Sequence, residues 1–580
     1  MPVINMSITD LSRLVGEDFN LKEFTDRIPM IGASVEKIEG DEISVEFFPN
    51  RPDLFSVEGV ARAYRRFQKG SKRDLFKRFF IESDTDMVLK VDQNIQDIRP
   101  IIGGAYIEGV ALDEYALISI MNLQEKLHLS LGRKRKKVAI GIHDADPIKA
   151  PFTYWASDPE EVSFVPLQKE GEWNLRRILK EHEKGIDYAW TLEDFDRYPM
   201  ITDSEDNVLS FPPIINGELT RVTTATKNIF VDCTGTDLKA VSLAVNIVCS
   251  QLADRGGRIR SIRIDYPDTD YYRDLKLRSE RWPRYSWAKH SLDLVFARSW
   301  LGIHIPERDI KESLYRMGYE DIHIEDDRIK CIVPPWRSDL LHPADIAEDI
   351  AIGYGFENFP GARPHVHTTG SERRITTMGR IIKETMVGLG FLEVRTISLS
   401  NEDDQFRLTG RVEHPHVRII NPITTEHTMM RMSALPTLMN LLHSNRHRDL
   451  PQKIFEAADV MVGNLSRVLL TGVSADNRAS YTEMKGTVQR ILSDIGVSYV
   501  IDSASDLKFY IPGRAAALMV EIPDIEGYEG PFPELITGKM IPIGHFGEMD
   551  PSLISEMELS SPVTGFELDL TLITDHLVDI

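Results

Sequence analysis

Four carboxylates lie within eleven residues of the stretch VPPWRSDLLHPADIAEDIAIGYGFENF, and they are Asp339, Asp345, Glu348 and Asp349. If a helix begins at Pro343, whose fixed φ suits a first turn, and ends near Gly355, the last three of these acids share one face. Like charges at neighbouring helical positions repel one another, so we expect a positive group beside them. A hard divalent cation such as Mg2+ prefers oxygen ligands and would fit this face together with Asp339 from the preceding turn.

The same acids also have a simpler explanation. Acids at the start of a helix can be stabilised by the helix dipole, by solvent or by a nearby cation such as Arg337. The spacing does not choose between these alternatives. The helical periodicity leaves Ile352 on the acidic face, which suggests a surface that meets a partner, although a single exposed isoleucine is ordinary.

The length of the chain predicts several domains. At 580 residues it exceeds what one hydrophobic core usually serves, and length alone predicts about four domains. Hydrophobic residues make up 42% and charged residues 27% of the chain, which is typical of globular proteins. The chain starts without a basic and apolar leader, no stretch approaches the ~18 apolar residues of a membrane span, and the cysteines are too few for a disulfide framework. We therefore expect a soluble, cytoplasmic, multidomain α+β protein with no membrane contact.

The charge balance limits where a nucleic acid could bind. A net charge of −22 excludes a footprint that covers the whole surface, because a polyanion would be repelled at long range. Two local basic tracts stand out, Tyr64–Phe80 and Gly132–Lys137. Either tract could hold phosphates, and either could be an ordinary solvated surface. The candidate contacts in the second tract are Arg133, Lys134, Arg135, Lys136 and Lys137.

Local patterns divide the chain into four predicted domains. An alternating strand, a PNRPD turn and a helix capped by Asp53 or Ser56 indicate a small α+β domain over residues 1–90, to which parts of residues 150–195 could belong. Short β-rich runs and one long helix indicate a mixed α/β domain over residues 91–270. Two helices, a hairpin and the acidic helix give residues 280–360 an arrangement that resembles a winged helix. Over residues 365–580, hairpin-like strands separated from helices favour an antiparallel sheet.

Four stretches carry a resemblance to a known family. They are FFPNRPDLFSVEGVARAYR, VLSFPPIINGELTRVTTATKNIFVDCTGTD, PPWRSDLLHPADIAEDIAIGYGFENF, and INPITTEHTMMRMSALPTLMNLL with KIFEAADV. In this order they resemble the beta subunit of phenylalanine–tRNA ligase, in its archaeal and eukaryotic type. The resemblance spans almost the whole chain.

The resemblance implies partners and cofactors. A chain of this family pairs with a catalytic alpha subunit, and two pairs form an (αβ)2 heterotetramer that uses ATP to attach phenylalanine to its tRNA. A magnesium ion at the contact with the alpha subunit is held by carboxylates that map onto Asp339, Asp345, Glu348 and Asp349. The tRNA becomes the expected partner of the basic tract Arg133–Lys137.

The last domain resembles the class II synthetase fold but lacks the residues that its active site needs. One arginine must bind the α-phosphate of ATP, and a second must reach the γ-phosphate. The corresponding stretches read KIFEAADV (Lys453–Val460) and VTGFELDL (Val563–Leu570), and neither contains an arginine. We therefore expect a scaffold and dimerisation domain without synthetic activity. Arg431 and Arg514 are further candidate cations, and the alternative for each is an ordinary surface or interface arginine.

The stretch ITDSEDNVLSFPPIINGELTRVTTATKNIFVDCTGTD resembles the editing domain of the family, which hydrolyses tyrosine wrongly attached to the tRNA. An apolar pocket for phenylalanine rejects an added hydroxyl only weakly, so a second site that binds the phenol supplies the missing discrimination. Asp232 or Ser210 would bind that hydroxyl, and Asn216 and Thr234 would orient the ester or the attacking water. The alternative is structural, with a proline-rigidified turn and an Asp232 that caps backbone amides.

Two other functions remain open. The chain could be a stand-alone aminoacyl-tRNA hydrolase with its own metal site, or a tRNA-binding scaffold. The acidity of the helix that starts at Pro343 argues against phosphate contact by the winged-helix-like unit.

Overall fold

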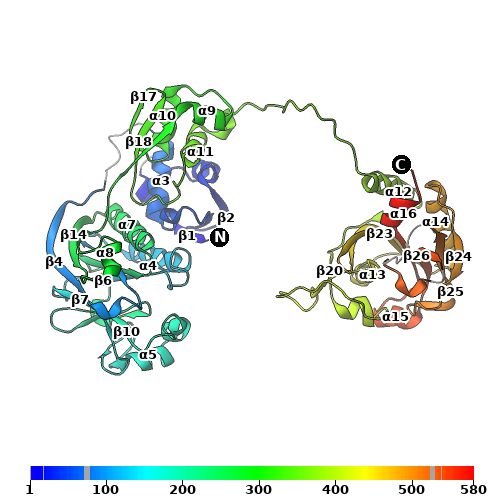
Figure 1. Ribbon diagram of the computed structural model, residues 1–580, viewed down its shortest axis with the longest axis horizontal. Coiled ribbons are helices and arrows are strands. Elements are labelled where there is room, and N and C mark those ends of the chain that lie inside the picture. Colours follow the sequence, from blue (N-terminus) through cyan, green and yellow to red (C-terminus); the bar gives the residue numbers. More distant parts are fainter. Residues whose placement is uncertain (1, 17–18, 71–78, 523–529, 537–538, 580) are drawn as a thin grey trace. The chain divides into compact units, whose positions relative to one another are not determined.

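The computed structural model describes residues 2–16, 19–70, 79–522, 530–536 and 539–579. It divides into two compact units, Met1–Arg363 and Pro364–Ile580 (Figure 1). None of the described helices combines the length and the apolar character needed to cross a bilayer. The part of the basic tract Tyr64–Phe80 that covers residues 71–78 lies outside the described residues.

The first unit opens with a small α+β domain. Its elements are β1 (Val3–Ser7), α1 (Ile8–Val15), α2 (Leu21–Arg27), β2 (Ala33–Glu39), β3 (Glu42–Phe47) and α3 (Val57–Lys69). The strands pair antiparallel in the order β1-β3-β2. The predicted strand, turn and helix are confirmed, and the helix is capped by Ser56, whose side chain accepts a hydrogen bond from the amide of Gly59. Asp53 is not the cap, because its carboxylate pairs with Arg51.

A ten-stranded mixed sheet forms the centre of the first unit. Its strands are β4 (Ser83–Val91), β5 (Ile101–Glu108), β6 (Val138–Asp144), β7 (Phe152–Ser157), β10 (Tyr198–Thr202), β11 (Val208–Phe211), β12 (Ile215–Asn216), β13 (Ile229–Gly235), β14 (Arg258–Asp265) and β15 (Ser279–Trp282). The order is β12-β11-β10-β7-β4-β14-β5-β13-β6, with β15 beside β14. Helix α7 (Leu238–Asp254) packs on β5, β13 and β6, and α4 (Glu114–Leu129) lies beside α7 (Figure 1). Since β4 pairs with β14 and β7, the large sheet begins at Ser83, earlier than the boundary predicted at residue 90.

Residues 150–195 pack with the domain of this sheet and not with the N-terminal domain. Besides β7, which is a strand of the large sheet, they form β8 (Ser163–Phe164), β9 (Trp173–Asn174), α5 (Leu175–Glu181) and α6 (Glu183–Tyr188). Strands β8 and β9 pair with each other. Their apolar side chains form a small separate core with residues of β10 and β11, such as Met200 and Phe211. The predicted link of this stretch to the first domain is therefore not found.

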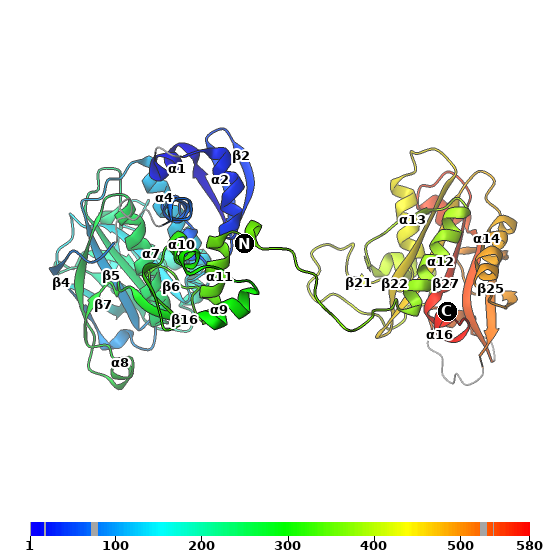
Figure 2. The same cartoon turned by 90° about the horizontal axis from the view of Figure 1, so that it is seen from above.

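A compact module follows the large sheet. After α8 (Asp270–Asp274) come β16 (Ala288–Asp293), α9 (Leu294–Leu301), α10 (Glu307–Arg316), β17 (Glu320–Glu325), β18 (Arg328–Val333) and α11 (Pro343–Tyr354). The predicted two helices, hairpin and third helix occur in that order, and β16 adds a third strand beside β18 that the sequence patterns did not indicate. Helices α9, α10 and α11 lie together (Figure 2), and α10 packs on α3 of the N-terminal domain.

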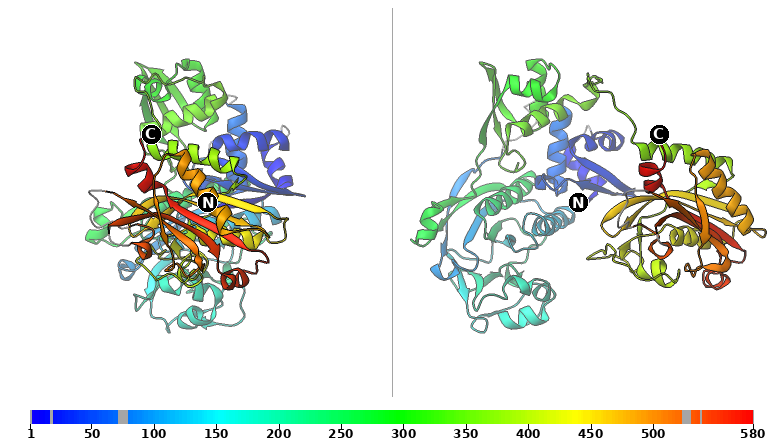
Figure 3. Two further views of the ribbon diagram at one scale, coloured as in Figure 1. Left: turned by 90° about the vertical axis from the view of Figure 1, so that its right-hand side faces the viewer. Right: turned by 45° about the vertical axis from the view of Figure 1, so that its right-hand side comes forward.

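The second unit is built on a seven-stranded sheet in the order β19-β22-β23-β27-β26-β25-β24. Its elements are α12 (Arg374–Gly388), β19 (Leu392–Glu393), β20 (Leu399–Ser400), β21 (Met429–Met430), α13 (Leu435–Ser444), β22 (Gln452–Val462), β23 (Leu465–Ala475), α14 (Tyr481–Asp494), β24 (Val500–Ser503), β25 (Tyr510–Glu521), β26 (Met540–Met549), α15 (Pro551–Glu556), β27 (Val563–Asp569) and α16 (Leu570–His576). The long strands of this sheet are drawn in yellow to red in Figure 3. The predicted antiparallel sheet is confirmed except at the edge, where β19 runs parallel to β22. Side chains alternate along each strand, so Phe455 packs with α12, α14 and α16, while Ile454 packs with α13 and α15.

Candidate functional site

A cavity of about 300 Å³ opens between the large sheet, α4 and the start of α6. The four side chains predicted for the editing site, Ser210, Asn216, Asp232 and Thr234, all line it. Asp232 and Thr234 face the same side because residues two apart on a strand point the same way. Between them, Cys233 belongs to the hydrophobic core, and burial holds the pKa of its thiol well above the usual value. Of the other polar residues in this stretch, Thr220 also lines the cavity, whereas Ser204 is exposed elsewhere.

Asp232 is held by a histidine that the sequence analysis did not single out. The Nε2 atom of His143 lies 2.6 Å from Oδ2 of Asp232, and its Nδ1 lies 2.7 Å from the hydroxyl of Thr220. A carboxylate only accepts hydrogen bonds, so Nε2 carries the proton that it donates to Asp232. No backbone amide donates to Asp232 among the described residues, so the capping role considered for it is not found.

Gly141 makes room for this pair. It lies opposite Asp232 in the pairing of β6 with β13. A Cβ at Gly141 would stand 2.0 Å from Oδ2 of Asp232 and 2.6 Å from Nε2 of His143, far closer than atoms can approach. The absence of a side chain at this position therefore allows the hydrogen bond between His143 and Asp232.

The other predicted residues differ in how freely they can bind a ligand. Ser210 is 2% exposed, and its hydroxyl has no hydrogen-bond partner among the described residues. Thr234 is occupied, because the buried Arg99 donates to its hydroxyl at 2.8 Å and to its carbonyl at 2.7 Å. Burial lowers the pKa of Arg99 to about 10. Half-buried Asn216 donates a long hydrogen bond of 3.4 Å to the carbonyl of Ile142. Among the four predicted residues, Ser210 therefore has the polar side-chain atom that is most free to bind a ligand.

One residue of the basic tract 133–137 is part of the cavity wall. Arg135 is 6% exposed and donates to the carbonyls of Pro213 and Ile214 and to the carboxylate of Glu125. It therefore supports the turn at the cavity and does not present its charge to a nucleic acid, contrary to the prediction. The remaining members face outward to different degrees. Arg133, Lys134 and Lys136 are exposed, and half-buried Lys137 pairs with Asp237 at 3.2 Å.

The acidic helix α11 forms where it was predicted, and its acids have separate partners. Asp345 caps the helix by accepting from the amides of Leu341 and His342, each at 2.6 Å. Arg337 donates to both oxygens of Asp339, at 2.8 and 2.6 Å. The same guanidinium and the hydroxyl of Tyr319 both donate to Oδ2 of the buried Asp349, each at 2.7 Å. Arg337 is thus the positive group that the repulsion between these acids requires.

These contacts bear on the expected magnesium ion. Within the described residues, no group of three or more histidine, cysteine, aspartate and glutamate side chains lies close enough together to hold a metal ion. As the chain stands alone, the four acids do not fit a shared metal site, because Arg337 already binds two of them. The side chain of Glu348 is largely exposed. Burial of its remaining part and the negative charges of Asp349, Asp345 and Asp339 raise its pKa. An excess of negative charge therefore remains on the outer side of the helix.

Exposed apolar side chains surround this charge. Leu341, just before α11, is 88% exposed, Val295 and Trp300 on α9 are 64% and 62% exposed, and Phe356 after α11 is 53% exposed. Phe296 stacks on Trp300 and contacts the ring of His342, which places α9 beside the start of α11. Apolar groups around a charged centre are typical of protein interfaces.

In the second unit, acids occupy the strands where the arginines for ATP would be expected. Glu456 of β22 binds Arg431, which is 1% exposed and also donates to Thr396 and to the carbonyl of Asp459. Glu567 of β27 accepts from Ser433 and Thr471 and from amides at the start of α13. Arg431 is therefore a buried structural residue and not a surface one.

The exposed cation expected in this unit has a partner of its own. The side chain of Arg514 is 61% exposed, and it pairs with Glu548 at 2.6 Å.

Replacing Arg337 by methionine should strongly destabilise the first unit. The change keeps most of the side-chain length but removes the cation that binds both Asp339 and Asp349, and leaves Asp339 with the more distant Arg51 at 3.9 Å. Breaking such a buried pair costs about 3–5 kcal/mol. Urea unfolding of the full chain, followed by tryptophan fluorescence, measures the loss. The control is Arg176→Met, because Arg176 pairs with Glu160 on the exposed surface. Equal losses for the two variants would show that Arg337 does not hold the acids.

Comparison with known proteins places these features in one family. Three family models match the chain: the phenylalanyl tRNA synthetase beta chain CLM domain over residues 360–570, the tRNA synthetase B5 domain over residues 291–356, and the B3/4 domain over residues 116–253. The first range covers most of the second unit and begins four residues before it. The second range covers most of the module with α11, and the third covers part of the domain with the large sheet and the cavity.

Whole chains agree with these matches. The phenylalanine–tRNA ligase beta subunit of Archaeoglobus fulgidus is 38% identical over 581 residues, which cover 99% of both chains. That of Methanothrix thermoacetophila is 39% identical over 573 residues, which cover 99% of this chain and 100% of the relative. An N-terminal fragment of the phenylalanyl-tRNA synthetase beta-subunit from Pyrococcus horikoshii is 38% identical with a TM-score of 0.57, and the match covers 61% of this chain and 99% of that chain. The chain belongs to the phenylalanine–tRNA ligase beta subunit family.

Proposed function

We propose that the chain supports attachment of phenylalanine to tRNA(Phe) together with a catalytic alpha subunit, and that within this complex the chain carries the site that hydrolyses mischarged Tyr-tRNA. The names of the relatives indicate a subunit of a ligase complex. The (αβ)2 stoichiometry, ATP as substrate of the complex and a cytoplasmic location stay predictions. The observation that carries the proposal is the cavity in which Ser210, Asn216, Asp232 and Thr234 meet.

The cavity provides what selective hydrolysis of a tyrosyl ester needs. The hydroxyl of Ser210 is buried and has no hydrogen-bond partner among the described residues, which costs about 1–3 kcal/mol unless a ligand binds it. A phenol would remove that cost, whereas phenylalanine would leave it in place. His143 fixes Asp232 through one oxygen, so the second oxygen can also accept from the phenol or from a water molecule. Arg99 holds Thr234 rigidly, and Asn216 is placed to orient the ester.

The second unit supports the division of labour with an alpha subunit. Phosphate transfer chemistry requires cations on the triphosphate. Glu456 and Glu567 instead stand on the two strands concerned and are bonded within the fold. We therefore assign this unit to assembly, as a class II-like scaffold without a synthetic active site.

We assign the contact with the alpha subunit to the outer, acidic face of α11. The uncompensated Glu348 and the exposed Leu341 and Trp300 support this assignment. Because no three of these acids lie close enough together among the described residues, a shared Mg2+ would use Glu348 together with ligands from the alpha subunit. Asp339 could take part only by releasing Arg337.

Removing the side-chain contacts in the cavity should abolish editing in graded steps. Ser210→Ala deletes the available hydroxyl and should slow release of tyrosine from Tyr-tRNA(Phe) by roughly tenfold or more. Gly141→Ala separates His143 from Asp232 and should slow it further. Gly379→Ala, where no atom lies within 4 Å of the new Cβ, should leave the rate unchanged. A wild-type rate in Ser210→Ala would remove this residue from the proposed site.

The same assay separates editing by a subunit from a stand-alone hydrolase. All four predicted residues and His143 come from this chain. Comparing tyrosine release by the chain alone and by the complex shows whether hydrolysis needs the partner for tRNA binding.

The chain alone should not activate phenylalanine. Exchange of pyrophosphate into ATP in the presence of phenylalanine should be absent for the purified chain and should appear when an alpha subunit is added. The reason is the missing pair of phosphate-binding arginines on β22 and β27. Formation of aminoacyl-adenylate by the chain alone would refute the division of labour.

Neutralising Glu348 should weaken assembly in a magnesium-dependent way. The wild-type chain should bind the alpha subunit less tightly when EDTA removes Mg2+, and Glu348→Gln should bind weakly with or without the ion. Glu307→Gln is the matched control, since Glu307 is an exposed acid in the first turn of α10 in the same module. Sedimentation or calorimetry measures the affinity. If EDTA does not change the affinity of the wild-type chain for the alpha subunit, an interface that depends on magnesium is excluded.

A further inference from the structure

A second cavity in the first unit has no part in the proposed function. It measures about 320 Å³ and lies where the N-terminal domain, the end of α7 and the module with α11 meet. Its wall includes residues of α3, Ala253 and Asp254 of α7, and the segments 316–318 and 334–337. The volume lies at the lower end of the ~300–1,000 Å³ typical of small-molecule sites.

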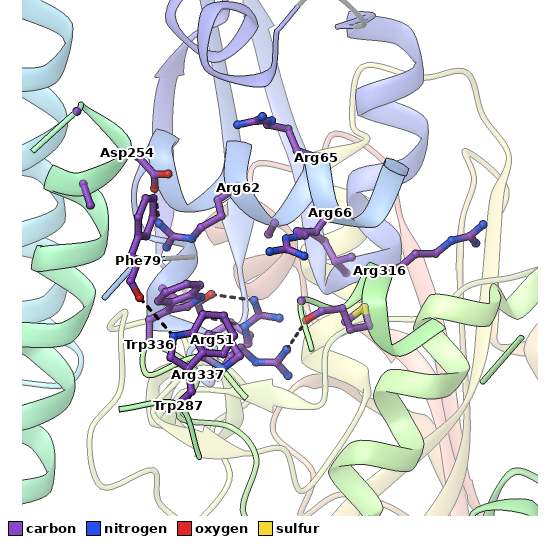
Figure 4. Close-up of a pocket in the computed structure, with 18 residues that line it drawn as sticks. Arg51, Arg62, Arg65, Arg66, Phe79, Asp254, Trp287, Arg316, Trp336 and Arg337 are labelled. Atoms are coloured by element: carbon purple, nitrogen blue, oxygen red, sulfur yellow. Dashed lines mark hydrogen bonds and ion pairs between the residues drawn. The ribbon is translucent and has the colours of Figure 1, made fainter. Parts of the chain in front are cut away.

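Arginines from two domains converge on this space. Figure 4 shows Arg62 and Arg66 reaching from α3 toward Trp336, with Arg51 and Arg337 on the opposite side of the group, whereas Arg65 and Arg316 point away from it. The chain as a whole has a net charge of −22, so a group of arginines at one place is not a consequence of composition.

Most of the acids that pair with these arginines lie on the side of the guanidinium groups that faces away from the cavity. Arg66 pairs with Glu320 at 2.7 Å, and Arg337 pairs with Asp339 and Asp349. None of these three acids is among the described wall residues. The guanidinium groups therefore lie between the acids and the cavity. A guanidinium has five N–H donors. Arg51 gives two of them to Asp53, so donors remain for a ligand. Arg337 gives four, to Asp339, Asp349 and the carbonyl of Met317, and keeps one.

Two acids do belong to the wall. Asp53 forms a two-bonded pair with Arg51, with both distances 2.8 Å. Asp254 accepts a hydrogen bond from Arg62, yet burial raises the pKa of Asp254 to about 6 despite this contact. Asp254 is thus the weakest counter-charge in the wall, and the inner surface of the cavity has more cationic than anionic groups.

Aromatic rings complete the wall. Phe79 and Trp287 are half-buried, and the indole of Trp287 donates to the carbonyl of Phe79 at 3.3 Å. Trp336 is covered by the guanidinium of Arg62, which lies 4.4 Å from its ring centre, and by the edge of Trp287. Rings of this kind bind planar groups by stacking, and arginines bind phosphate through paired donors.

We propose that this cavity binds a small ligand that joins a phosphate group to a planar ring, which is the chemistry of a nucleoside monophosphate. The phosphate contacts Arg62 and the neighbouring guanidinium groups of Arg51 and Arg337. The ring contacts Phe79 and Trp287. The site is independent of the editing cavity, because the two share none of their described wall residues.

Calorimetry with the full chain and three probes tests the proposal. AMP should bind, and inorganic phosphate and adenosine should each bind at least about tenfold more weakly, because each supplies only half of the contacts. Phosphate binding as tightly as AMP would overturn the role of the rings, and adenosine binding as tightly would overturn the role of the arginines. Absence of AMP binding would overturn the site itself. The chain is used without an alpha subunit, so no synthetic active site can account for the signal.

Two variants locate the bound AMP. The double change Arg62→Gln with Asp254→Gln removes one guanidinium together with its paired acid, so neither is left buried alone, and it should weaken AMP binding about tenfold or more. Phe79→Ala leaves the charges intact and should weaken AMP but not phosphate. The control is Arg176→Gln with Glu160→Gln, an exposed pair of the same kind. Undiminished AMP binding by both test variants would place the ligand elsewhere, including in the second unit, and would refute this site while leaving the editing assay untouched.

Discussion

The first unit depends on the buried guanidinium of Arg337, because it stands between two groups of like charges. On one side it binds Asp339, which precedes α11, and Asp349, which lies on α11. On the other side it lines the cavity of about 320 Å³, where its positive charge repels that of Arg51. A buried charge persists only when it is paired, so the acids and the arginines hold each other in place. The acidic outer face and the cationic cavity are therefore two sides of one network, and this network joins the module to the N-terminal domain.

Local signals were enough to predict α11. A proline suited to the first turn, a glycine after the last turn and helical spacing between them all act within the segment itself, and the structure follows them. The pairing of Asp232 and Thr234 on one face is local in the same way, because strand alternation fixes it. The partners of these residues are not local. His143 lies 89 positions from Asp232 in sequence, and Arg99 lies 135 positions from Thr234. Such contacts arise only when strands and loops far apart in the chain meet, so the sequence pattern could not reveal them.

Charge counted along the sequence proved a poor guide to where a side chain lies. Arg135 belongs to a run of basic residues yet is buried against the turn at Pro213, and Arg431 is enclosed by Glu456 and Thr396. In both cases the guanidinium also donates to backbone carbonyls of the fold. A basic residue whose donors are needed inside the fold looks the same in sequence as one that meets solvent. The domain boundary at β4 was misplaced for a related reason, because parallel pairing with β14 and β7 is not encoded in the strand itself.

The strand β13 also determines which chemistry the cavity proposed for editing lacks. Alternation turns Cys233 into the hydrophobic core, where its sulfur stays protonated, and the described wall residues include no other cysteine. A thiolate next to an activated ester would be acylated and would need a second step to regenerate. With the sulfur turned away, an ester in this cavity has no thiol to which it can transfer its acyl group. Hydrolysis there would then not pass through a thioester, and it would be insensitive to oxidants and alkylating agents that disable thiol-dependent hydrolases.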